Sequence, residues 1–288
     1  MATQVSTRGG RGAGWARVWQ TLGTHAVLLV CTAVAVAPIF LILVNSVKSR
    51  QAIFKTPFAL PTPATWDLVG YRTVLGGANF ELYFFNSLFV TLVSLAFILL
   101  FSSMAAFALA EYRFFGNAFL GLFCALGIMI PIRLGTVSIL RLMKALGLID
   151  TLWALVCVYV AAGIPLAVFI LTQFMGQVPG GLKEAARIDG ASEYRIYLLV
   201  LPLVRPALGT VAVFNMIPIW NDLWFPLILA SSEKSKTVIL GAQTFLGQYV
   251  NDWNAVLASL TLAMIPIVVL YILFSRQLIQ GLTSGAVK

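Results

Sequence analysis

Charge is what this sequence lacks most. Only 10% of its 288 residues are charged, while 60% are hydrophobic; an ordinary soluble domain has about 25% charged residues. Apolar runs near or above the roughly 18 residues needed to cross the hydrocarbon core of a bilayer recur along the chain. The shortage of charge therefore argues against a soluble domain and predicts an all-α integral membrane protein.

The residues of metal and redox chemistry are also scarce. The chain has three cysteines and one histidine. Cys31, Cys124 and Cys157 all lie inside apolar runs, no CxxC pair occurs, and His25 stands alone, so neither a disulfide framework nor a zinc site is suggested. We interpret the cysteines as small buried thiols. No metal or cofactor is expected in this chain.

Two further function classes are disfavoured. The net charge of +9 could suggest nucleic acid, but Lys and Arg are scattered singly between apolar runs and form no continuous basic face. No GxxxxGK[ST] phosphate loop occurs, and the nearest approach, residues 176–183, has Leu182 where that motif needs lysine. We expect a chain that contacts membrane lipid but no nucleic acid, and that has no ATPase site of its own.

The apolar runs predict six transmembrane helices. The third run is interrupted by Arg133 after Pro131, and the fifth carries Asp222, so these two are the least regular. The first run follows a basic stretch like that of a signal peptide, but it is long enough to span and lacks a cleavage site, so it is predicted to be retained. The predicted spans are 26–44, 88–110, 118–140, 152–175, 207–230 and 255–275.

Charge asymmetry between the loops says little about orientation. With both termini inside, ten of the 19 Lys and Arg residues fall on the cytoplasmic side and nine on the external side. The basic stretch before the first span favours an internal N-terminus. Both termini are therefore predicted to be cytoplasmic.

The internal connection before the fifth span, residues 178–206, is rich in charge and predicts two short helices. Gly190 is expected to end the first helix, and Ser192 is suited to cap the next. Pro202 and Pro206 mark the turn into the fifth span. The seven charged residues of this stretch are Lys183, Glu184, Arg187, Asp189, Glu193, Arg195 and Arg205.

The first of these helices is expected to have an apolar stripe at i, i+3 and i+6, with its charged residues facing away and Glu184 pairing with Arg187. Small alanines let the backbone of another protein approach, and the charged face supplies polar contacts, so we predict a docking element. A helix resting on lipid headgroups is the alternative, disfavoured by the mixed charges. The stripe consists of Leu182, Ala185 and Ile188.

At this point the sequence resembles a known family. The loop closely matches the EAA motif of type I ABC importer permeases, and the match covers nearly the whole chain from the first span onward. Together the motifs resemble the MalG-like permease subunits of carbohydrate importers, the binding-protein-dependent transport system inner membrane components. The matching elements are Glu184-Ala-Ala, Asp189-Gly-Ala, Leu201-Pro, Pro206, Asn86-Ser87, Leu146-Gly-Leu-Ile-Asp-Thr, Pro165, Trp220-Asn-Asp and Gly281-Leu-Thr-Ser-Gly-Ala-Val-Lys.

The resemblance implies a MetI-like fold with six transmembrane helices. It divides the chain into a cytoplasmic tail (1–24), a first transmembrane helix (25–45), an external loop (46–85), a transmembrane domain (86–276) with its coupling loop (178–206), and a second cytoplasmic tail (277–288). The ATPase-coupling residues it implies are Glu184, Ala185, Ala186, Asp189, Gly190, Ala191, Pro202 and Pro206. A tail that contacts the ATPase, with a frayed end as the alternative, would comprise Gly281, Leu282, Thr283, Ser284 and Gly285.

The resemblance also implies a set of partners. These are a second, MalF-like permease subunit, two MalK-like ATPase subunits that hold ATP and Mg, an external solute-binding protein, and a carbohydrate substrate. A type I permease for a non-sugar solute and a secondary transporter remain open as alternatives, although no internal repeat of the kind secondary transporters show is clear.

Polar residues at membrane depth are candidates for the translocation pathway. For Asp222 a structural role at a helix bend is an equal alternative. For Arg133 we favour snorkelling to the outer interface over a place in the pathway; should it line a cavity instead, an anionic or phosphorylated sugar becomes plausible. The asparagines could instead bond neighbouring helices. The candidates are Arg133, Asn215, Trp220, Asn221 and Asp222.

Overall fold

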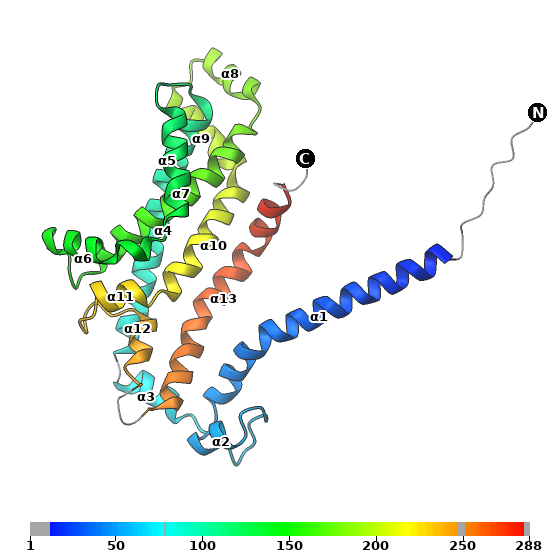
Figure 1. Cartoon of the computed structure of the whole chain (residues 1–288), viewed down its shortest axis with the longest axis vertical. Helices are drawn as coiled ribbons and strands as arrows, with labels where there is room; N and C mark the ends of the chain where they lie inside the picture. Colours follow the sequence, from blue (N-terminus) through cyan, green and yellow to red (C-terminus); the bar gives the residue numbers. More distant parts are fainter. Residues whose placement is uncertain (1–11, 78, 247–250, 285–288) are drawn as a thin grey trace, which may run out of the picture.

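The chain folds into a bundle of long helices (Figure 1). A computed structural model describes residues 12–77, 79–246 and 251–284, with the helix ends 12–18 and 273–284 described as backbone only. Among the described residues, the only β structure is two isolated bridges. The predicted all-α class is confirmed.

Four described helices are long and apolar enough to cross a bilayer, and two bent pairs raise the number to six if each pair is one span. The four are α1 (Gly12–Ser46), α4 (Phe80–Glu111), α7 (Leu152–Gly176) and α13 (Trp253–Ser284). The predicted number of six therefore holds only when the bent pairs are counted as spans.

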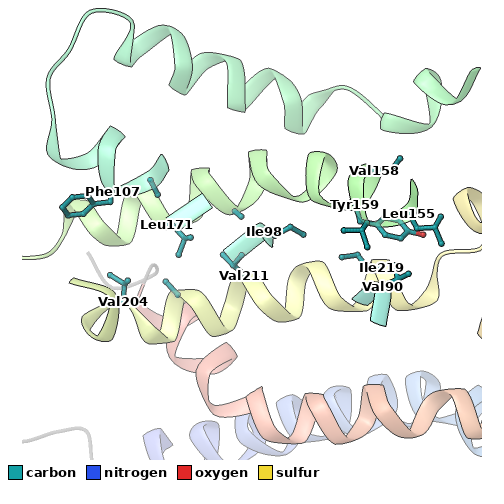
Figure 2. Packing of buried hydrophobic residues seen from close by; sticks show 14 of the residues in the cluster. Val90, Ile98, Phe107, Leu155, Val158, Tyr159, Leu171, Val204, Val211 and Ile219 are labelled. Atoms are coloured by element: carbon teal, nitrogen blue, oxygen red, sulfur yellow. The ribbon is translucent and has the colours of Figure 1, made fainter. Parts of the chain in front are cut away.

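The core lies where α4, α7 and α10 (Arg205–Asn221) pack together. Figure 2 shows side chains of the three helices meeting along their length, with Ile98 of α4 near Val211 of α10. Gly163 of α7 allows this approach: a Cβ there would lie 2.5 Å from both Ile98 Cδ1 and Asn215 Oδ1. Small residues at membrane helix contacts let backbones come close.

Gly163→Val is therefore expected to destabilise the bundle by on the order of 2 kcal/mol, because the added side chain overpacks the contact. The measurement is thermal melting of the detergent-solubilised transporter. Gly121→Val on α5 is the matched control, since a Cβ at Gly121 meets nothing within 4 Å. Equal melting of the two variants would contradict the packing described above.

The predicted third span, 118–140, is wrong in its second half. Helix α5 (Asn117–Met129) ends before Pro131, and the chain turns by 86° into η1 (Ile132–Gly135) and α6 (Thr136–Ala145). Proline disfavours helical backbone in the residue before it, and Ile130 is extended, with ψ 118°. Only Met143 of α6 is buried, so α6 projects sideways from the bundle (Figure 1).

The predicted fifth span, 207–230, is also broken. Helix α10 ends at Asn221, and α11 (Trp224–Leu229) begins after a gap at Asp222 and Leu223. The Asp222 carboxylate accepts hydrogen bonds from the backbone N–H groups of Trp224 (3.3 Å) and Phe225 (3.1 Å). Asp222 therefore has the structural role at a helix bend that its sequence context suggested.

Other helix boundaries differ from those predicted from the apolar runs. Helix α4 begins at Phe80 and α13 continues to Ser284, well beyond 88 and 275. The predicted external loop contains α2 (Arg50–Lys55) and α3 (Val69–Gly77), and α12 (Val238–Gln243) precedes α13. Helices continue into polar residues because backbone hydrogen bonding does not stop where hydropathy falls.

The end of α1 is fixed by a buried lysine. Lys48 Nζ donates to Asn45 Oδ1 (3.2 Å) and to the Thr56 carbonyl (3.0 Å), and the Lys48 carbonyl accepts from Asn254 Nδ2 (2.6 Å). Burial lowers the pKa of Lys48. Away from this end, α1 leans out from the bundle with its apolar side chains exposed (Figure 1).

Candidate functional site

The coupling loop contains the two predicted short helices. Helix α8 (Gly180–Ile188) ends two residues before Gly190. The φ of Gly190 is +77°, a backbone conformation that glycine adopts readily. Helix α9 (Glu193–Leu203) follows, and the chain bends by 75° into α10. Ser192 occupies the N-cap position, but its side chain makes no capping hydrogen bond. Pro202 lies within α9, and Pro206 is in the first turn of α10.

Two of the charged residues of α8, expected to supply polar contacts to another protein, are turned inward. Lys183 is buried and Arg187 half-buried, whereas Leu182 and Ile188 are 43% and 86% exposed. The side of the helix with Lys183 and Arg187 faces the protein, while Leu182, Ile188 and the charged Glu184 are exposed.

The cause of this orientation is a cluster of ion pairs at the end of α4. Glu111 accepts from Lys183 Nζ and, at 2.7 Å, from Arg187 Nη2. Arg187 Nε also donates to Glu193 at 2.9 Å, and the Tyr112 hydroxyl donates to Glu193 at 2.5 Å. We call these five residues the ion-pair cluster. It ties α8 and α9 to α4.

The predicted pair between Glu184 and Arg187 is not formed, because Arg187 donates its hydrogen bonds to Glu193 and Glu111 instead. Hydrogen bonds to Glu193 and Glu111 raise the pKa of Arg187. Burial, together with the bond to Glu193, raises the pKa of Tyr112 to about 12. Both groups therefore keep their protons at neutral pH, and the cluster stays intact.

The outward side of α8 consists of Leu182, Ala185 and Ile188, which we call the docking face. Exposed Glu184 and Asp189 border it. Figure 1 shows α8 at one tip of the molecule. Apolar side chains held outward on a projecting loop are typical of interaction surfaces.

The remaining coupling and tail predictions are placed as follows. Ala186 and Ala191 pack against the main core, and the Ala191 N–H donates to the Ala186 carbonyl at 2.9 Å. Gly281, Leu282, Thr283 and Ser284 form the last turn of α13, which points toward the α8 end of the bundle (Figure 1). Their side chains, and Gly285, lie outside the described residues.

A cavity of about 780 Å³ lies between α7, α10, η1 and α11. It brings together four of the predicted pathway residues: Arg133, Asn215, Asn221 and Asp222. Trp220 is not among its lining residues. Trp220 is buried and donates its Nε1–H to the Ala263 carbonyl of α13 at 3.0 Å, which is a structural role.

The polar centre of the cavity is Asp222. The Tyr159 hydroxyl donates to Asp222 Oδ2 at 2.9 Å, and Arg133 Nη2 lies 3.6 Å from Oδ1. The Arg133 guanidinium also lies 5.9 Å from the ring centre of Trp224, whose Nε1–H donates to Thr136 Oγ1 at 3.0 Å. Arg133 therefore lines the cavity, against the snorkelling favoured from the sequence.

The two asparagines do not bridge helices through their amide nitrogens. Asn215 Nδ2 donates to the Val211 carbonyl at 2.9 Å and Asn221 Nδ2 to the Ile217 carbonyl at 3.0 Å, each within its own helix.

The sequence did not identify Glu111 as the residue that pairs with the coupling loop. Glu111 directly follows the second apolar run, and its charge is opposite to that of Lys183 and Arg187. An acidic residue at the end of a predicted span was the feature that could have indicated this contact.

A broken-helix bundle with a polar-centred cavity and a docking face at one tip defines the class: a multi-pass membrane transport subunit. The chain belongs to the family described as binding-protein-dependent transport system inner membrane component, whose model matches residues 82–284.

Relatives cover nearly the full length of the chain. It is 39% identical to an ABC transporter permease protein, ORF2, of Caldicellulosiruptor sp., over 91% of this chain and 94% of that one. It is 34% identical to the arabinooligosaccharides transport system permease protein AraQ of Halalkalibacterium halodurans, over 88% and 92%. Its fold matches, at TM-score 0.78 and 23% identity, a chain of a bacterial ABC transporter that imports the acidic polysaccharide alginate, over 94% and 99%.

Proposed function

We propose that this chain is the permease subunit of an ABC importer that moves a carbohydrate across the cytoplasmic membrane, driven by ATPase subunits that dock on α8. The observation that carries the proposal is the docking face, held outward because the ion-pair cluster turns Lys183 and Arg187 of α8 toward α4. Membership of the family supports it.

The complete transporter would contain a second, MalF-like permease, two MalK-like ATPases that bind ATP and Mg, and an external solute-binding protein. A docking face that meets a cytoplasmic ATPase would put the α8 end of the bundle inside, and with it both termini. The tail from Gly281 to Gly285 would reach the same ATPases. Catalysis of ATP hydrolysis would belong entirely to these partners.

The mechanism follows from how α8 is attached. Closure of the ATPase dimer would displace α8, and the ion-pair cluster would pass the movement to α4 through Glu111. The second route is α9, which is continuous with α10 through the bend at Val204. Since α4 and α10 pack on α7, the cavity would open alternately to the two sides.

A carbohydrate substrate is supported by the cavity and by the relatives. A permease of 34% identity is named for arabinooligosaccharides, and the cavity combines aromatic rings with hydrogen-bonding groups. A type I permease for a non-sugar solute is the alternative; it would show uptake of amino acid, phosphate or polyamine and none of sugar. A secondary transporter would work without ATP.

The test compares Gly190→Pro with Gly190→Asn in the assembled transporter. Proline cannot adopt a φ of +77°, whereas asparagine tolerates it. We expect Gly190→Pro to lose ATP-driven uptake of labelled arabinotriose or maltotriose while remaining in the membrane, and Gly190→Asn to retain most of it. Normal uptake by Gly190→Pro would refute docking through α8.

A further inference from the structure

The charge of the cavity is balanced. Among the residues that line it, only Arg133 and Asp222 are charged, and their signs are opposite. Their side chains face each other at 3.6 Å, which is longer than a hydrogen bond. The formal charge presented to a ligand is therefore zero.

The two charged groups differ in how firmly they are held. Asp222 Oδ2 accepts from the Tyr159 hydroxyl and from the Phe225 N–H, and Oδ1 accepts from the Trp224 N–H. The carboxylate is thus fixed in place and only 10% exposed. Arg133, in contrast, is 67% exposed, so its guanidinium is free to donate to a ligand.

The walls of the cavity suit the carbon skeleton of a sugar. Phe214 of α10 and Trp224 of α11 are 46% and 42% exposed, and both rings line the cavity. Aromatic rings offer apolar contact area, as ligand pockets commonly do beside a few placed polar groups.

Both helix breaks border this cavity. The break at Pro131 supplies η1 with Arg133, and the break at Asp222 supplies α11 with Trp224. Irregular backbone at membrane depth is tolerated where it is buried or lines a cavity. In many transporters interrupted helices form the substrate site.

We propose that this cavity is a binding site for an uncharged oligosaccharide, in which one hydroxyl accepts from Arg133 while it or its neighbour donates to Asp222, with Phe214 and Trp224 against the ring. The proposal rests on the proposed function. An acidic or phosphorylated sugar is rejected, because an anion beside Arg133 also meets the fixed Asp222 carboxylate. The presence of Arg133 in the cavity therefore does not favour an anionic sugar, contrary to the expectation from sequence.

The test measures ligand binding to the assembled transporter in nanodiscs by saturation-transfer NMR. The probes are the uncharged arabinotriose and maltotriose and the acidic trigalacturonate. We expect saturation transfer to at least one uncharged probe and none to trigalacturonate. Arg133→Met should weaken binding of the uncharged probe about tenfold or more, while Arg141→Met, which changes an exposed arginine of α6 outside the cavity, should leave it unchanged.

Asp222→Asn provides the sharpest outcome. The amide keeps one of the two oxygens that accept from the backbone of α11. It leaves Arg133 without a counter-charge, so trigalacturonate should now bind. Thermal melting checks that the variant is folded. A second pair of variants, Trp224→Phe and Trp224→Leu, tests whether the site needs an aromatic ring or only an apolar side chain of some size. We expect Trp224→Leu to lose binding and Trp224→Phe to keep it.

Three results would overturn the inference: no uncharged probe binds, trigalacturonate binds equally well to the unaltered transporter, or Arg133→Met binds normally. If uptake is ATP-driven and any of these occurs, the site is wrong and the proposed function stands. If no carbohydrate is taken up at all, the proposed function fails instead.

Discussion

Replacing Ile188 by aspartate is expected to weaken binding of the partner ATPase by at least about thirtyfold, as removal of an interface hot spot does. Ile188 is 86% exposed and lies on the docking face of α8. A charge there would be buried against the ATPase without a partner, which is costly. Uptake of labelled sugar should fall to background, and the ATPase should no longer copurify.

Two companion variants make this result specific. Ile188→Leu keeps an apolar side chain of similar size and should retain uptake, whereas Leu182→Asp, on the same face, should repeat the loss. The two Ile188 variants should not change the melting temperature of the permease, because Ile188 is 86% exposed. Unimpaired copurification of the ATPase with Ile188→Asp would show that α8 docks by another face.

Glu111→Gln is expected to have the second largest effect. The Glu111 carboxylate is 10% exposed and is shared by Lys183 and Arg187. Removing it leaves Lys183, itself 10% exposed, without a counter-charge, which should cost on the order of 3 kcal/mol. Since the cluster ties α8 to α4, ATP hydrolysis by the partner subunits should continue while uptake is lost. Melting, hydrolysis and uptake are measured on the same preparation.

The double variant Glu111→Gln with Lys183→Gln should recover part of the lost stability, because it removes the unpaired charge. Glu81→Gln is the matched control: its side chain is exposed in the first turn of the same helix, α4, and surface substitutions usually change stability little. A Glu111→Gln transporter that couples hydrolysis to uptake normally would show that the cluster does not transmit movement.

In the coupling loop, features that depend on local sequence were predicted, and features that depend on distant contacts were not. The two helices and their hinge were predictable, because Gly190, Pro202 and Pro206 act on their own backbone. The direction in which α8 faces was not, because it depends on Glu111, 72 residues before Lys183 in the chain. Periodicity identifies two faces of a helix but does not say which one is covered.

The broken spans were visible as irregularities but not as bends. Arg133 after Pro131, and Asp222, were both recognised as interruptions of apolar runs. Hydropathy continues past Pro131 through apolar residues of α6, so composition alone predicts one straight span where the chain turns by 86°. The direction of a helix depends on its packing, which hydropathy does not report.

The lining of the cavity was predicted only in part, because it too depends on how the helices pack. Asn221 and Asp222 line it, but the adjacent Trp220 points to α13, because successive residues of a helix lie about 100° apart around its axis. Tyr159 and Trp224 were visible only as two of many aromatic residues. Their contacts with Asp222 and Arg133 appear once the helices are in place.

The most direct test is reconstitution into proteoliposomes, with ATP hydrolysis and accumulation of labelled arabinotriose or maltotriose measured together. We expect ATP-dependent accumulation only when this chain, its partner permease, the ATPases and the binding protein are all present, and hydrolysis without accumulation when Glu111 is replaced. Accumulation in vesicles that lack this chain, or hydrolysis by this chain alone, would contradict this expectation.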